Sequence, residues 1–281
     1  MRTEDKEAAK AIIASRKRKT NCFSFHNEIV SWLDDGKAEA FIVDENVFLF
    51  LRVQSFYKFY YFVSELAQIA GAEKLLDEYR RHYEVTLEFT TKKNRNLDSV
   101  KDAVIPFGFS HYAEYARIIT GPSAYESGVE QQGEYELASL DDTGQLLEIM
   151  YRNFDVLTDD LPTEEELKRL INDKAVIVSH MDGRIIFIQI YEYAQGALYS
   201  RMTWIEKKYR KPKYTIDLYR GLDEYLKQLC IGENKNLRSY GWINKAIRNY
   251  KINLKFGAIP DGLTCNIFLY KPGKEAPQTE S

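Results

Sequence analysis

Three basic residues, Arg210, Lys211 and Lys213, lie within four positions and come just before a predicted helix that begins near Thr215. The N–H groups at a helix N-terminus attract anions, and lysine and arginine side chains add positive charge at the same place. Thr215 can also cap the helix with its hydroxyl group. This spacing predicts a loop that holds an anionic ligand, and the alternative is a basic surface loop without one.

A single carboxylate interrupts an apolar strand face. Alternation with period two places Glu192 on the same face as Ile188 and Ile190, in a predicted strand over residues 184–193. A charge on such a face is costly unless it is paired. Glu192 is therefore either a functional base or a residue at an exposed strand end, and both interpretations remain open.

The other residue types that often do chemistry show no recognisable arrangement. The four histidines are dispersed, and no two of them have the spacing of metal ligands. The three cysteines are far apart, which argues against a disulfide framework or a zinc site. Neither a Walker loop nor a Rossmann glycine pattern is present. We therefore expect no bound metal.

Composition and charge fit a soluble globular protein. The chain has 281 residues, of which 44% are hydrophobic and 29% charged, and a net charge of −3. This balance gives no field that would favour nucleic acid or an anionic membrane. The N-terminus lacks the apolar run of a secretion signal, and no stretch approaches 18 apolar residues. We expect a cytoplasmic protein without a membrane span.

The elements that must position these residues occur in two similar series, separated by a stretch over 120–133 that is rich in Gly, Ser, Gln and Pro. The first series predicts helices over 4–18 and 26–35, strands over 38–43, 46–53 and 56–63, a helix over 65–82, a strand over 83–89, a helix over 97–105 and a strand over 112–118.

The second series repeats this order. A strand over 134–140 precedes a helix to about residue 153 that Asp141 and Asp142 would cap, and Thr163 is the expected N-cap of the next helix. Further strands are expected over 175–180, 184–193 and 197–205, then a helix over 215–229, a strand over 237–242, a helix over 245–255 and a strand over 265–270.

From Glu134 onward, this order resembles that of the GCN5-related N-acetyltransferase (GNAT) superfamily. The Asp182-Gly183 turn resembles the hairpin between the second and third strands of that fold. Residues 253–258, Asn-Leu-Lys-Phe-Gly-Ala, resemble its closing helix, Lys-Phe-Gly-Phe and strand signature. Phe107-Gly108-Phe109 is a looser copy of the same signature in the first half.

This resemblance implies an α/β (α+β) protein of two tandem GNAT-like domains. Each domain would have a mixed, mostly antiparallel central sheet flanked by helices. The expected domains are a degenerate one over 1–128 and an N-acetyltransferase domain over 129–281, the second being the active copy.

The resemblance also implies a site for acyl-CoA. In this fold the fourth and fifth strands splay apart, and the pantetheine arm pairs with exposed backbone of the fourth strand, here Met202, Thr203 and Trp204. The loop that follows would hold the pyrophosphate. Its implied residues are Arg210, Lys211, Lys213, Tyr214 and Thr215, although Lys213 and Thr215 stand where the family has small residues that allow close backbone approach.

The family's general acid is a Tyr four residues before the glycine of the closing motif, and here that position holds Asn253. Tyr250, one helical turn earlier, is the candidate substitute. Asn244 and Asn249 lie where the family commonly has a cofactor-contacting Asn, although helix capping explains Asn244 equally well. Glu192 is the candidate base that would deprotonate the acceptor amine.

These features predict an acyltransferase that moves an acyl group, expected to be acetyl, from CoA to an amine of a small molecule or peptide by direct attack. The alternative is a non-catalytic GNAT-fold binding or regulatory protein that has lost acetyl-CoA chemistry. Aminoacyl-tRNA-dependent transferases also use two such domains, but this sequence has no room for their helical hairpin arm. The sequence identifies neither the acceptor nor the oligomeric state.

Overall fold

The computed structural model describes residues 3–15, 17–120, 135–194, 197–210, 221–222, 224–225 and 238–271. The chain divides into two units, Met1–Tyr115 with Gly262–Ser281, and Ala116–Asp261. Both boundaries fall inside long strands, β6 (Phe109–Thr120) and β12 (Ile259–Tyr270), so each of these strands contributes to both units. The predicted domains and the two units differ in the last strand, β12. The prediction assigned this strand to the second domain, whereas most of it belongs to the first unit.

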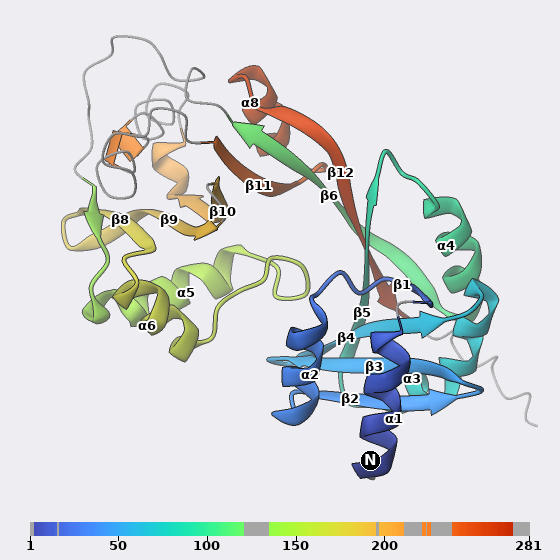
Figure 1. The fold of residues 1–281 in the computed structure, drawn as a ribbon. Helices are drawn as coiled ribbons and strands as arrows, with labels where there is room; N and C mark the ends of the chain where they lie inside the picture. The colour runs from blue at the N-terminus through green and yellow to red at the C-terminus, as the bar shows by residue number, and fades with distance from the viewer. Residues whose placement is uncertain are drawn as a thin grey trace, which may run out of the picture. The chain divides into compact units, whose positions relative to one another are not determined.

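The first unit follows the predicted series closely. Its elements are α1 (Thr3–Ala14), β1 (Lys19–Thr20), α2 (His26–Asp34), β2 (Ala38–Val43), β3 (Asn46–Val53), β4 (Phe56–Val63), the 3-10 helix η1 (Leu66–Ala72), α3 (Glu73–Arg80), β5 (Glu84–Lys92), α4 (Leu97–Val104) and the short 3-10 turn η2 (Ile105–Phe107) (Figure 1).

The strands of the first unit lie in the order β2, β3, β4, β5, β12 and β6. The three strands β2 to β4 form an antiparallel meander, β5 runs parallel to β4, and β12 is antiparallel to β5. The final strand of the chain therefore lies inside the N-terminal sheet. Its residues from Gly262 onward pair with β5, with Leu263 opposite Lys92 and Leu269 opposite Thr86.

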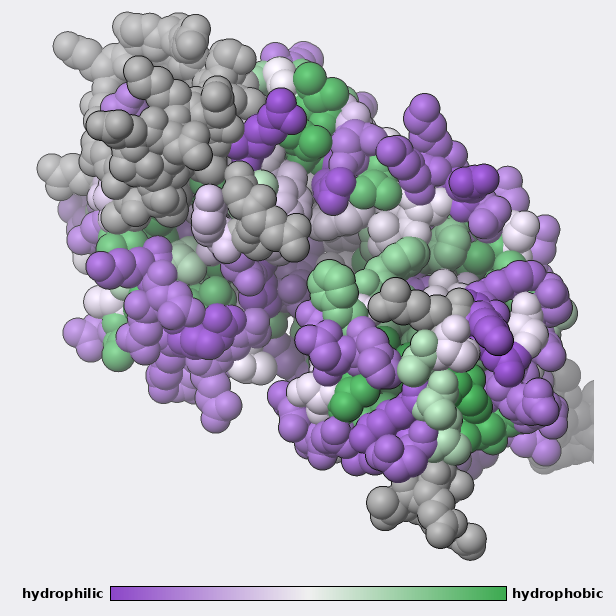
Figure 2. Space-filling view, in the orientation of Figure 1, coloured by the Kyte–Doolittle hydropathy of each residue, from purple (hydrophilic) through white to green (hydrophobic). Residues whose placement is uncertain are grey.

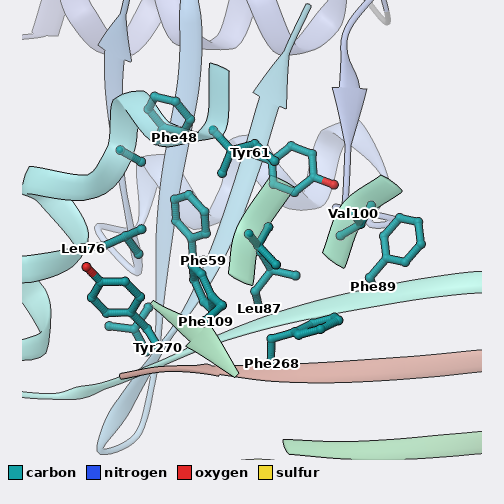
Figure 3. Close-up of a cluster of buried hydrophobic side chains, with 14 of the residues drawn as sticks. Phe48, Phe59, Tyr61, Leu76, Leu87, Phe89, Val100, Phe109, Phe268 and Tyr270 are labelled. Atoms are coloured by element: carbon teal, nitrogen blue, oxygen red, sulfur yellow. The ribbon is translucent and has the colours of Figure 1, made fainter. Parts of the chain in front are cut away.

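Strand β4 is buried on both faces, which explains its nearly continuous aromatic sequence. Phe59 and Tyr61 face a core covered by η1, α3 and α4, in which Phe109, Phe268 and Tyr270 also pack (Figure 3). Tyr60 and Phe62 face the opposite core, which α1 and α2 cover. Helices on both faces thus fix β4 in place.

The second unit repeats this design. Its elements are β7 (Glu136–Leu137), the 3-10 turn η4 (Leu140–Asp142), α5 (Thr143–Asn153), α6 (Glu164–Asn172), β8 (Val176–Met181), β9 (Arg184–Ala194), β10 (Ala197–Ile205), the 3-10 turn η5 (Lys207–Tyr209), β11 (Arg238–Asn244) and α8 (Arg248–Lys255). Its strands lie in the order β6, β11, β10, β9, β8 and β7.

Two tight hairpins support the predicted strand boundaries. Asp44 and Glu45 have φ of 47° and 62°, and Asp182 and Gly183 have φ of 53° and 73°. Positive φ at two successive residues is the conformation that two-residue hairpin loops require. Three strands, β2, β3 and β4, begin and end at their predicted residues.

Several predicted elements differ in the structure. The expected helix over 65–82 begins as the 3-10 helix η1, in which Gly71 is a weak helix former. Asp142 is the N-cap residue of α5, as predicted, but its side chain makes no cap hydrogen bond within α5. Its carboxylate instead accepts from the backbone N–H of Ser139, the N-cap residue of η4, at 2.7 Å. The helix over 245–255 begins at Arg248. Of the predicted linker over 120–133, residues 121–133 lie outside the described residues, as does most of the predicted helix over 215–229.

Thr163 caps α6 as predicted, since its hydroxyl oxygen accepts from the Glu166 backbone N–H at 3.2 Å. None of the described helices is long and apolar enough to cross a lipid bilayer. Hydrophilic residues dominate the described surface in Figure 2, with smaller hydrophobic areas between them.

A histidine ties β7 to β8 in the second unit. His180 contacts Glu136 through Nδ1 at 2.6 Å and Asp142 through Nε2 at 3.0 Å. Burial by itself lowers the pKa of His180, but the hydrogen bonds to the two carboxylates outweigh burial and raise that pKa above its ordinary value. The folded protein therefore holds a proton on this imidazole more tightly than the unfolded chain does.

We expect His180 to stabilise the protein more at acidic than at alkaline pH. Its folded-state pKa exceeds the unfolded value of about 6.5, so its contribution is complete below that pH and is lost as the pH rises through the folded-state pKa. His180→Gln should lower the free energy of unfolding by about 1 kcal/mol near pH 5.5 and by less near pH 9. Urea unfolding at both pH values measures this difference, and an equal cost at both would contradict it.

Candidate functional site

Strands β10 and β11 of the second unit form a fork. They pair in parallel over four residues, from Ala197 opposite Arg238 to Ser200 opposite Gly241. The pairing ends there, although β10 continues to Ile205 and β11 to Asn244. The fork lies between the two strands for which a splay was predicted. Beyond Ser200, β10 presents backbone N–H and C=O groups that β11 does not pair.

The closed end of the fork is tightly packed. A Cβ atom at Gly241 would lie 3.0 Å from the carbonyl oxygen of Ser200, so a larger residue here would require β10 or β11 to move by a few tenths of an ångström. The rings of Tyr199 and Tyr240 stack beside it, with centroids 5.2 Å apart. The strands therefore separate at a defined point.

A β-bulge in β10 coincides with the point of separation. Ser200 lies opposite Tyr191 of β9 and Met202 lies opposite Ile190, which leaves Arg201 as an extra residue without a partner on β9. A bulge bends its strand and interrupts regular pairing, and bulges are common beside active sites. The bulge thus marks the open part of the fork.

The bulge residue is anchored by its own side chain. The Arg201 side chain is only 4% exposed, and its guanidinium contacts the carboxylates of Glu166 at 2.8 Å, Glu192 at 3.3 Å and Asp160 at 3.4 Å. It also donates to the Asp160 carbonyl oxygen at 2.9 Å. The carboxylate of Glu192 is therefore paired with an arginine.

On the other face of β10, Gln189 of β9 is fully buried and spans the bulge. Its side-chain Nε2 donates to the Ser200 hydroxyl at 2.7 Å, and its Oε1 accepts from the Thr203 hydroxyl. Gln189 thus bonds to one residue on each side of Arg201. The bulge is held from both faces of the sheet.

The matching strands of the first unit also form a fork, but the chain itself fills it. Strands β4 and β5 pair in parallel only as far as Lys58 opposite Thr86. Strand β1 then pairs with the end of β4, with Lys19 opposite Val63. The register between β3 and β4 runs without a shift, so β4 has no bulge where β10 has one.

Asn21 completes this filling and is only 2% exposed. Its Nδ2 donates to the carbonyl oxygens of Phe59 in β4 at 3.0 Å and Glu88 in β5 at 3.1 Å. Its Oδ1 accepts from the backbone N–H of Tyr61 at 2.9 Å. One carboxamide therefore takes up backbone groups of both strands in the N-terminal fork.

The two units share one further detail. Phe107 and Phe256 each precede a glycine with positive φ, Gly108 at 113° and Gly257 at 86°. Both glycines donate their N–H to the carbonyl oxygen three residues earlier, and a strand follows each. The helix, Phe-Gly and strand signature thus occurs twice, as predicted.

Comparison with solved structures agrees with this doubling. A tandem GNAT protein from the clavulanic acid biosynthesis pathway aligns with a TM-score of 0.55 and 10% identity, over 97% of this chain and 96% of that one. A GCN5-related N-acetyltransferase from Sphaerobacter thermophilus aligns with a TM-score of 0.58 and 11% identity, over 97% and 95%. The chain has the tandem GNAT fold. No family model and no curated protein matches the sequence.

Within this GNAT fold, the predicted cofactor-binding residues of β10 have their side chains engaged inside the protein, so mainly their backbone groups are available to a ligand. Met202 is 4% exposed and packs into the core under α5 and α6. The hydroxyl of Thr203 bonds to Gln189. Trp204 packs against the same core as Met202, and its buried Nε1–H has no hydrogen-bond partner among the described residues.

Part of the predicted phosphate loop can be placed. Arg210 follows η5, and its Nε donates to the carbonyl oxygen of Ile205, the last residue of β10, at 2.6 Å. A guanidinium has five N–H donors, so this bond leaves it able to bind an anion. The other predicted loop residues, Lys211, Lys213, Tyr214 and Thr215, lie outside the described residues.

The remaining predicted residues lie on or beside α8. Asn253 donates from Nδ2 to the Asn249 carbonyl oxygen at 2.9 Å, one turn back in the same helix, and Tyr250 is half-buried. Asn244 accepts from the Ala246 backbone N–H at 2.9 Å, so it stabilises the turn after β11, while the N-cap residue of α8 is Ile247. Helix capping by Asn244, considered from the sequence, is therefore wrong.

The described residues fit an acyl-CoA. The part of β10 that β11 does not pair can bind an extended amide-containing ligand. The Trp204 Nε1–H has no acceptor among the described residues, and Arg210 supplies positive charge where β10 ends. The sequence did not single out Asn21, Gln189, Arg201 or Gly241. For Gln189 and Arg201 the sequence signal was a polar residue within a predicted strand, and Asn21 and Gly241 gave no such signal.

Proposed function

We propose that this protein is a CoA-dependent N-acyltransferase whose second unit binds the acyl-CoA, with acetyl-CoA as the expected donor. The observation that carries this proposal is the open fork between β10 and β11, with a bulge at its branch point. The fork of the first unit, filled by Asn21, supports assigning the activity to the second unit.

The proposed reaction is direct transfer to an amine of a small molecule or peptide. The neutral amine nitrogen forms a bond to the thioester carbonyl carbon, the carbon–sulfur bond breaks, and the CoA thiolate leaves and takes a proton. The backbone of β10 would hold the amide-containing arm of the donor by strand-like pairing. Arg210, with Lys211 and Lys213, would face the pyrophosphate.

Glu192 is the proposed base. An amine is protonated near neutral pH and must lose a proton before it attacks. The contact with Arg201 orients the Glu192 carboxylate, whose side chain is 40% exposed and so remains accessible to solvent and acceptor. Glu192 would accept the ammonium proton directly or through a water molecule.

Calorimetric titration tests the proposal directly. We expect one acetyl-CoA to bind per chain, because only the second fork is open. Propionyl-CoA and free CoA are the companion ligands, since they share the pantetheine and pyrophosphate but differ in the acyl group. Absence of binding by all three at millimolar concentration would overturn the proposal. Two equivalent sites would overturn the assignment to the second unit alone.

A non-catalytic CoA-binding or regulatory protein is the second candidate, and Asn253 favours it. Asn253 occupies the position implied for the general acid, but a carboxamide does not release a proton at neutral pH, and its Nδ2 is bonded to Asn249. This candidate predicts acetyl-CoA binding without CoA release in the presence of a panel of amines. Mass detection of an acylated amine would exclude it.

A further inference from the structure

The bulge in β10 is the structural feature that distinguishes the open fork from the filled one. In the second unit, the register between β9 and β10 shifts at Arg201, directly after Ser200, the last residue of β10 paired with β11. In the first unit, β3 and β4 stay in register from Val53 opposite Phe56 to Val47 opposite Phe62. The shift and the open strand edge therefore occur together in only one of the two described forks.

A bulge of this kind needs support, because regular pairing would satisfy more backbone groups. Arg201 provides support on the α6 face through its three carboxylate partners. On the opposite face, Gln189 is 0% exposed and lies directly opposite Thr203 in the β9–β10 register. Its carboxamide is hydrogen-bonded to Ser200 and Thr203, one residue on each side of the bulge.

This geometry makes the Gln189 carboxamide specific for the bulged register. In a regular register, the residue after Ser200 would lie opposite Ile190, and Gln189 would face a different position of β10. A fully buried amide that loses its partners is destabilising, because its donors and acceptor then lack both water and protein partners. Gln189 therefore penalises slippage of β10 into the unbulged pairing.

We propose that Gln189 is a positioning residue for acyl-CoA binding, which holds the bulge at Arg201 so that the backbone beyond it stays available to the ligand. This inference rests on the proposed function. Gln189 itself does not touch the ligand, since it is buried beneath β10 and acts through Ser200 and Thr203. Replacing Gln189 should weaken acyl-CoA binding by more than the accompanying loss of folding stability can explain.

The test variant is Gln189→Met, which keeps an unbranched side chain of similar length and removes the carboxamide. We expect its dissociation constant for acetyl-CoA to rise about tenfold or more, which corresponds to about 1.4 kcal/mol. The matched control is Ile185→Val, a buried and modestly destabilising change in the same unit, at a residue of β9 that pairs with His180 of β8 and not with β10. The control should bind acetyl-CoA within about twofold of the original chain.

A second readout does not depend on the ligand. Amide hydrogen exchange of Arg201, Met202 and Thr203 in the free protein should be faster in Gln189→Met than in Ile185→Val at equal global stability, because only the first change releases the bulge. If Gln189→Met does not fold, Thr203→Val removes one of the two hydrogen bonds with little change of shape and should weaken binding in the same direction.

Unchanged affinity for acetyl-CoA in folded Gln189→Met, or equal losses in the variant and the control, would overturn the role of Gln189. Failure of the original chain to bind any acyl-CoA is a different result, and it would overturn the proposed function. In that case unchanged exchange rates at Arg201–Thr203 would also show that Gln189 does not hold the bulge. Faster exchange rates would show that Gln189 supports the bulge but has no role in acyl-CoA binding.

Discussion

Replacing Asn21 with alanine should lower the free energy of unfolding by about 3 kcal/mol. The side chain is 2% exposed and makes three hydrogen bonds to backbone groups of β4 and β5. Alanine would leave the carbonyl oxygens of Phe59 and Glu88 and the N–H of Tyr61 without these partners. Buried polar groups left unsatisfied cost about 1–3 kcal/mol each, and water entering the gap would recover part of that cost.

Urea unfolding of Asn21→Ala measures this effect, and Asn27→Ala is the matched control because Asn27 is exposed in α2. The control should change the unfolding free energy by less than about 0.5 kcal/mol. Asn21→Asp should be at least as harmful as alanine, because a carboxylate cannot donate to the two carbonyl oxygens. A loss below about 1 kcal/mol in Asn21→Ala would show that this contact does not hold the first fork closed.

The filling of the first fork also bears on acyl-CoA binding. The groups that Asn21 satisfies belong to the same pair of strands that, in the second unit, leaves its edge open. Asn21→Ala should therefore leave one acetyl-CoA bound per chain, because β1 still pairs with β4 in that variant. A second site appearing in the variant would mean that Asn21 alone excludes the ligand.

Much of the fold follows from local patterns. The hairpin turn at Asp44 and Glu45 and the runs of apolar and aromatic residues indicate β2, β3 and β4, whose bounds agree with the sequence prediction. The twofold Phe-Gly signature and the repeated order of elements indicate the doubled architecture. These features are local, so single segments of the sequence reveal them.

The place of the last strand could not be predicted in this way. Residues from Gly262 onward have an ordinary strand pattern, which does not reveal that their partner is β5, far away in the sequence. Strand pairing between distant segments depends on the whole chain and leaves little local signal. The predicted domain division therefore placed this strand with its sequence neighbours, in the second half.

The site was less predictable than the fold for the same reason. Asn21 follows a basic segment and has a composition typical of a loop, yet its partners lie 38 and 67 residues away. The sequence identified Glu192 as unusual because it is a carboxylate on an otherwise apolar strand face. It did not identify Arg201 as the ion-pair partner of Glu192. The sequence thus located the strand that carries the fork and missed the residues that shape it.

Arg201→Met should lower the free energy of unfolding by about 2 kcal/mol and weaken acetyl-CoA binding as well. Loss of one partner of a buried ion pair costs about 3–5 kcal/mol, but here the carboxylates of Asp160, Glu166 and Glu192 are 35–59% exposed, and solvent screening reduces the cost. The three carboxylates would also repel one another once the guanidinium is removed. This repulsion would disturb Glu192 and the bulge together.

Urea unfolding and calorimetry measure the two effects, and Arg152→Met is the matched control. Arg152 pairs with Glu148 at 2.7 Å, but both side chains are more than 60% exposed, so its loss should cost less than about 0.5 kcal/mol and leave binding unchanged. Raising the salt concentration should partly restore the stability of Arg201→Met, because ions screen the repulsion among the remaining carboxylates. If the two arginine variants were equally stable, the Arg201 cluster would be a surface network, and the bulge would depend on Gln189 alone.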